Sequence, residues 1–161
     1  MTFKLHPGAE DYFKDLKVKE SQRVNSARSI STLWDMYYLA LVIGMKNNDS
    51  SVEPSVQKEI KERAEFHKAY TKEYQHLKYI IIALLIKVES KKLGVNLDER
   101  EQIKSLIEKY TTNEYPFLSS IASQSLNEYH YAGFEYLKNH IDKPYDESIF
   151  WQNYINLIEK L

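Results

Sequence analysis

Glycine and proline, the residues that most often interrupt helices and strands, are scarce in this chain of 161 residues: there are four of each. The stretch 55–93 contains neither. A β-sandwich or another loop-rich fold needs many more turn residues. Hydrophobic residues make up 43% of the chain and aromatic residues 13%, which is enough to bury a core. We therefore expect a mainly α-helical bundle in a single domain.

Charge and cysteine content exclude several classes of protein. The 22 Lys and Arg residues nearly balance the 23 Asp and Glu residues, so the chain is neither a basic nucleic-acid coat nor an acidic tail. Cysteine is absent, which excludes disulfides, zinc-thiolate sites, iron–sulfur clusters and a cysteine nucleophile. The longest apolar run, 79–86, is too short to span a membrane, which takes about 20 residues. We expect a soluble cytoplasmic protein.

Hydrophobic spacing and capping residues predict a short N-terminal strand and about six helices. Residues 1–47 form a strand-helix-helix unit, and residues 48–161 form a helical bundle that packs with it as one domain. The predicted strand covers residues 1–6. The predicted helices cover 9–19, 33–45, one or two helices within 55–93, a short helix that Asn96 or Asp98 caps and that ends at about Tyr110, 116–139 and a last helix after Asp146. Ser31 or Thr32 is expected to cap the helix 33–45 together with Asp35. Gly94 is expected to end the helical stretch 55–93.

Candidate catalytic residues are few. Glu73 and His76 match the Glu-x-x-His element of di-iron bundles, but such sites need the element twice, and no second copy occurs. The chain contains no HExxH, GxSxG, GxxxxGK[ST] or GxGxxG motif. We therefore expect no catalytic residue, no metal and no cofactor, and interpret the protein as a non-enzyme.

The order of elements in residues 1–47 resembles that of a ribbon-helix-helix protein, in which paired strands of a dimer enter the DNA major groove. In this interpretation Lys4 contacts DNA, Arg23 and Arg28 add charge, and the helix N-terminus at Thr32 holds a phosphate. The simpler alternative, which we prefer, is that the strand joins a small local sheet or a partner's sheet. Lys4 and His6 then point into solvent.

Thirteen tyrosines and a set of small residues indicate a surface for protein partners. Tyrosine is common at interfaces, and the small residues of the predicted helix 116–139 allow a neighbouring helix to approach closely. The last helix carries apolar residues on more than one face, so we expect a partner to cover part of it. The predicted partner-binding residues are Tyr129, Gly133, Tyr136, Phe150, Trp151 and Tyr154.

Two pairs of segments resemble subunits of bacterial anti-phage systems. FKLHPGAEDYFKDLK (3–17) followed by TLWDMYYLALVIGM (32–45) resembles the opening of the small DndE-type subunits of DNA-phosphorothioation systems. ISTLWDMYYLALVIGMKN (30–47) with SSIASQSLNEYHYAGFEYLKNHI (119–141) is similar to small helical defence subunits. These include phosphorothioation-associated proteins and the middle component of Lamassu-type, or ABC-three-component, systems. The resemblance implies a non-catalytic subunit that bridges larger ATPase (SMC-like) and nuclease partners of the same operon, and it leaves a DNA contact within that complex open.

Overall fold

The computed structural model describes residues 3–16, 30, 32–51, 61–62, 77–114 and 117–161, and these residues are mainly α-helical, as predicted. The two short strands are β1 (Lys4–Leu5) and β2 (Lys61–Glu62). The helices of the described residues are α1 (Ala9–Tyr12), α2 (Leu33–Lys46), α5 (Leu77–Leu93), α6 (Arg100–Tyr110), α7 (Ser120–His140) and α8 (Glu147–Lys160), and a 3-10 turn covers Lys14–Leu16.

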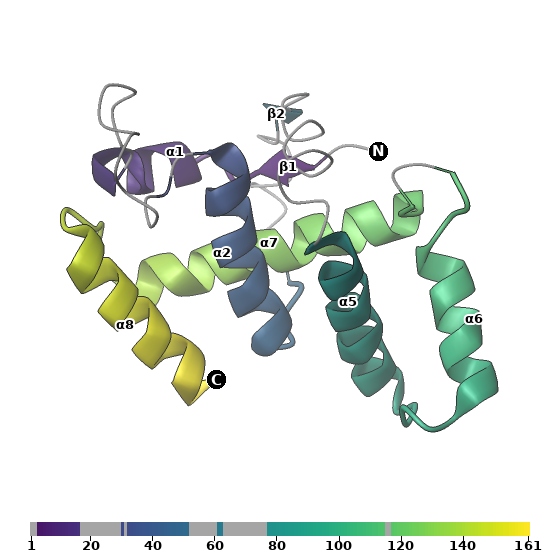
Figure 1. The fold of residues 1–161 in the computed structure, drawn as a ribbon. Coiled ribbons are helices and arrows are strands. Elements are labelled where there is room, and N and C mark those ends of the chain that lie inside the picture. Colours follow the sequence, from purple (N-terminus) through teal and green to yellow (C-terminus); the bar gives the residue numbers. More distant parts are fainter. Residues whose placement is uncertain (1–2, 17–29, 31, 52–60, 63–76, 115–116) are drawn as a thin grey trace.

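Helix α7 runs through the middle of the fold (Figure 1). Along it, from its C-terminal to its N-terminal end, lie α8, α2 and α5, while α1 and β1 lie above it in this view. The core is formed by buried side chains from all these elements, among them Trp34, Leu85, Phe134 and Phe150. No helix of the described residues is long and apolar enough to cross a membrane.

Helices α2 and α7 cross in direct backbone contact at two glycines. A Cβ atom on Gly133 would lie 1.9 Å from the carbonyl oxygen of Ala40, and one on Gly44 would lie 1.9 Å from the carbonyl oxygen of Tyr129. Any side chain here would force the helices apart. The small residues of α7 therefore admit a neighbouring helix, and that neighbour is α2 of the same chain.

Several of the predicted helix boundaries are confirmed. Thr32 and Asp35 form a capping box at the start of α2, and the Asp146 side chain accepts the Ile149 N–H at the start of α8. Gly94 follows α5 with a φ of 68°, a conformation that glycine adopts at little cost.

Other boundaries differ from the prediction. Helix α7 begins at Ser120, capped by Ser119, because Leu118 pairs with Thr111 in an isolated β-bridge and Phe117 has a φ of 67°. Pro116, the predicted first residue, lies outside the described residues. Helix α6 begins at Arg100, and its N-cap is Glu99 rather than the predicted Asn96 or Asp98. The predicted helix 9–19 becomes α1 and a 3-10 turn as far as Leu16, and 17–19 lie outside the described residues.

Strand β1 belongs to a small local sheet, which is the preferred alternative of the sequence analysis. It pairs antiparallel with β2, with Lys4 opposite Glu62 and Leu5 opposite Lys61. Side chains of α7 also bind its main chain: Asn127 Oδ1 accepts the Lys4 N–H at 2.9 Å, and the Tyr131 hydroxyl donates to the Leu5 carbonyl at 3.1 Å. The strand is thus fixed to the central helix.

Candidate functional site

Four of the six predicted partner-binding residues are core residues of this chain. Tyr129, Gly133, Phe150 and Tyr154 are buried, so they do not form the partner surface that the sequence suggested. Helix α2 covers Gly133, and the Tyr154 hydroxyl donates to the Leu39 carbonyl of α2 at 2.8 Å. At Gly133, the small-residue face predicted to bind a partner packs instead against α2 of the same chain. Tyr136 and Trp151 are half-buried, and the Trp151 Nε1–H donates to Glu147 at 3.2 Å.

Tyr129 belongs to a polar cluster that joins α5, α6 and α7. Its hydroxyl and that of Tyr110 each donate to the Glu89 carboxylate at 2.7 Å. The Lys92 ammonium lies 4.4 Å from the centre of the Tyr129 ring. Burial, followed by the hydrogen bond to Glu89, raises the pKa of both tyrosines. The hydroxyls are therefore protonated and structural at neutral pH.

Two of the four predicted nucleic-acid residues, Lys4 and Thr32, lie in the described part of the chain. The Thr32 N–H and hydroxyl bind the Asp35 carboxylate at 2.7 and 2.9 Å, so the helix N-terminus expected to hold a phosphate already has an anion of its own. Lys4 lies in β1, whose partner is β2 of the same chain rather than the strand of a second copy. Arg23 and Arg28 lie outside the described residues.

The histidine-containing elements give no metal centre in the described part of the chain, which contains no group of three or more His, Asp or Glu side chains that could hold a metal ion. Glu73 and His76, the Glu-x-x-His pair, lie outside the described residues.

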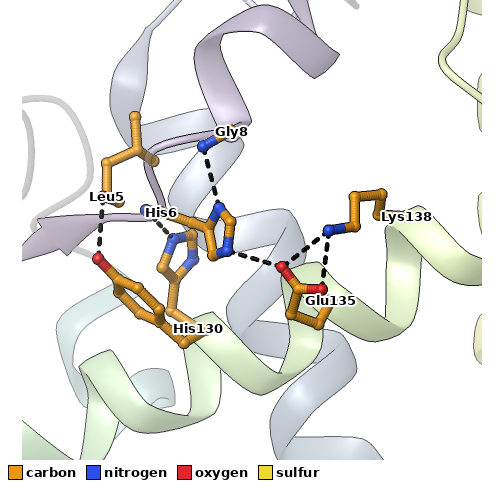
Figure 2. A network of polar contacts seen from close by, with 7 residues as sticks. Leu5, His6, Gly8, His130, Glu135 and Lys138 are labelled. Carbon is orange, nitrogen blue, oxygen red and sulfur yellow. Dashed lines mark hydrogen bonds and ion pairs between the residues drawn. The ribbon is translucent and has the colours of Figure 1, made fainter. Parts of the chain in front are cut away.

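His130 on α7 is fully buried (Figure 2). Its Nε2 accepts the main-chain N–H of His6 at 3.0 Å, and its Nδ1 lies 3.0 Å from the Tyr37 carbonyl oxygen of α2. Because a carbonyl only accepts, Nδ1 carries the proton and the ring is neutral. Burial lowers the pKa of His130 to about 3. The ring joins α7 to α2 and to the segment after β1, and it stays neutral near neutral pH.

His6 is also buried, contrary to the expectation that it points into solvent. The chain turns at Pro7-Gly8, and the ring packs against Phe134 of α7. Its Nδ1 accepts the Gly8 N–H at 3.0 Å, and its Nε2 lies 2.8 Å from Glu135, which also contacts Lys138 (Figure 2). These contacts fix the segment after β1 to α7.

A groove of about 480 Å³ lies between the C-terminal end of α7 and α8, and it is the candidate site for a ligand or partner. Its lining comes from three segments: the last turns of α7, the connection 141–146 and one side of α8. Tyr136 and Phe150, two of the predicted partner-binding residues, are among the lining residues. The groove therefore includes two of the six predicted residues, and the rest of its lining comes from other residues of α7, α8 and the connection between them.

On the α7 wall of the groove, Tyr136 and His140 contact each other. The His140 ring stacks on Tyr136 with ring centres 3.9 Å apart, and its Nδ1 lies 2.8 Å from the Tyr136 carbonyl oxygen. In the connection, Lys143 forms an ion pair with Asp11 at 2.9 Å, which ties this part of the groove to α1. This ion pair lowers the pKa of Asp11.

The α8 wall carries exposed apolar and amide side chains. Ile149 is 46% exposed, and Tyr145 just before the helix is 79% exposed. The exposed lining residues of α8 are Ile149, Asn153, Asn156 and Lys160. These residues were not selected from the sequence. The one signal for them was the prediction that the last helix has apolar residues on more than one face, and the exposure of Ile149 and Ile155 confirms it.

Comparison with known proteins adds no family to this description: no protein-family model, no curated protein and no solved structure matches the chain.

Proposed function

We propose that this chain is a protein-binding subunit without catalysis of its own, which bridges larger partners through the groove between α7 and α8. The observation that carries the proposal is the groove itself, where exposed apolar groups lie beside amides and charges. Protein interfaces likewise combine apolar contacts with hydrogen-bonding and charged groups. The Tyr136 and His140 rings on the α7 wall are already stacked on each other, and such pre-organisation lowers the entropy cost of binding.

The biological setting of the proposal comes from the resemblance of 3–17, 30–47 and 119–141 to small subunits of anti-phage systems. We propose a bacterial defence complex, with an ATPase of the SMC-like type or a nuclease from the same operon as the partner. In such a complex the chain positions one large subunit against another.

Co-expression with the products of neighbouring genes tests the proposal. The complex is purified through a tag on this chain, and its mass is measured after size exclusion. We expect a stable complex that Ile149→Glu abolishes, since a charge in the groove cannot be desolvated without a partner charge. Ile155→Glu is the matched control, because Ile155 is 53% exposed on the same helix and does not line the groove.

Two results contradict the proposal. A chain that remains a monomer with every neighbouring product does not act as a bridging subunit. A complex that tolerates Ile149→Glu, or loses its partner equally with Ile155→Glu, does not form through the groove.

A further inference from the structure

Four exposed side chains of α8 line the groove. Ile149, Asn153, Asn156 and Lys160 are spaced by four, three and four residues, so they form one stripe along the helix. The stripe begins with an apolar side chain, continues with two amides and ends with a cation. Each position is exposed, and all four line the groove.

The two amides are free to bind a ligand. Among the described residues, no hydrogen bond within the chain involves the side chain of Asn153 or Asn156. Each amide offers two donors and an acceptor, the set that matches the N–H and C=O of a peptide group.

This pairing selects the conformation of the partner. A docked helix has already used its main-chain groups in its own hydrogen bonds, so it leaves the amides without partners. An extended segment leaves its main-chain N–H and C=O groups free for such pairing. Residues three apart on a helix have Cβ atoms about 5–6 Å apart, close to the roughly 6.6 Å between alternate residues of an extended chain. Asn153 and Asn156 can thus each bind one of two alternate residues.

The two ends of the stripe determine which side chains the partner needs. Tyr145 and Ile149 offer an exposed apolar site at one end. At the other end, no described carboxylate lies within ion-pair distance of the Lys160 ammonium. The eleven steps from residue 149 to residue 160 span about 16 Å of helix, which corresponds to about five residue steps of extended chain.

We propose that the groove between α7 and α8 binds an extended peptide segment of the partner. Asn153 and Asn156 bind its main chain, Tyr145 and Ile149 hold a large apolar residue, and Lys160 pairs with an acidic residue about five positions away. This proposal rests on the proposed function and adds to it the chemistry of the segment that is recognised.

A library of random linear twelve-residue peptides, displayed and selected on the full chain, supplies the probe. The enriched sequences are then synthesised with a fluorescent label, and their dissociation constants are measured by anisotropy. We expect an apolar residue followed by Asp or Glu about five positions later. We also expect single N-methyl groups to weaken binding at two alternate positions and to have little effect at the position between them.

Variants of the chain test each part. The double variant N153A/N156A is expected to weaken binding about tenfold, since two hydrogen bonds are lost. Gln152→Ala, an exposed amide of α8 that does not line the groove, is the matched control and should change nothing. Lys160→Glu should weaken binding, and exchanging the acidic peptide residue for Lys should restore it. Because these side chains are exposed, thermal melting should show unchanged folding.

Three results overturn the inference: no enriched sequence, peptides that bind N153A/N156A as well as the original chain, or bound peptides that are helical by circular dichroism. The complex formed by co-expression with neighbouring gene products distinguishes failure of this inference from failure of the proposed function. A complex that is lost with Ile149→Glu but unaffected by N153A/N156A keeps the protein-binding function and rejects the extended peptide. The absence of any complex rejects the protein-binding function, while the peptide titrations still decide the binding mode.

Discussion

Lowering the pH from 7.5 to 5.0 should destabilise the protein through His130. The folded chain holds this ring neutral, with Nδ1 donating to the Tyr37 carbonyl and Nε2 accepting from His6. The ring is stacked on Tyr37 of α2 at 4.3 Å, and the ring of His6 faces it from the β1 side. The nearby carboxylate, Glu135 of α7, contacts His6.

The magnitude follows from the two pKa values of His130. Its pKa is about 3 in the folded protein and about 6.5 in the unfolded chain. Below pH 6.5 the unfolded chain takes up a proton that the folded chain does not bind, so stability falls as the pH falls. Between pH 6.5 and 5.0 this amounts to about 2 kcal/mol, at roughly 1.36 kcal/mol for each pH unit.

Urea denaturation at pH 7.5 and 5.0 measures this loss in the original chain and in His130→Gln, which has no titrating ring. The original chain should lose about 2 kcal/mol more than the variant over this range. His140→Gln removes an exposed histidine and serves as the control that retains the full loss. Nitrogen NMR shifts of the ring should show the Nδ1–H form throughout. A ring that titrates near 6.5, or equal losses in the chain and in His130→Gln, refutes the reasoning.

Three further substitutions test the packing and capping contacts. Gly133→Ala should lower the free energy of unfolding by about 3 kcal/mol or more, because its Cβ would meet the backbone of α2. Gly94→Ala, which has open space around it but a positive φ, should lower it by only about 1 kcal/mol. Equal losses in urea denaturation would contradict the close crossing of α2 and α7. Tyr129→Phe should lower the free energy of unfolding by about 1.5 kcal/mol, because the hydrogen bond to the Glu89 carboxylate is lost. The double variant with Glu89→Gln should lose less than the sum of the two single variants. Additive losses would mean that the two side chains do not interact. Thr32→Ala should cost about 1 kcal/mol in thermal unfolding, while Thr32→Ser, which keeps the hydroxyl, should be neutral.

The predictable part of the fold is the part set by neighbours in sequence. The capping box at Thr32, the cap at Asp146 and the left-handed Gly94 follow from residues within one helical turn, and all three are confirmed. The scarcity of glycine and proline correctly indicates a mainly helical chain. Such local rules hold because their hydrogen bonds join residues that are already close.

Where the prediction of the site was wrong, the deciding contact was long-range. The small face around Gly133 allows a close neighbour, but nothing in its spacing says whether that helix belongs to the same chain. The alternation of Phe3 and Leu5 with polar residues places His6 in solvent, and only the turn at Pro7-Gly8 and the packing of Phe134 bury it. Asn153 and Asn156 read as ordinary surface amides until the fold brings α7 beside them.

The attachment of β1 to α7 has a consequence for how the chain is made. The hydrogen bonds of Lys4 to Asn127 and of His6 to His130 join residues 123 and 124 positions apart. At a translation rate of about 5–20 residues per second, the ribosome needs roughly 6–25 s to reach the acceptors after the donors have been added. For that interval Phe13 lacks the ring of Phe134 in α7, against which it packs in the folded protein. The N-terminal segment is therefore open to chaperones and proteases during that interval, and its hydrogen bonds to α7 form only after synthesis has passed α7.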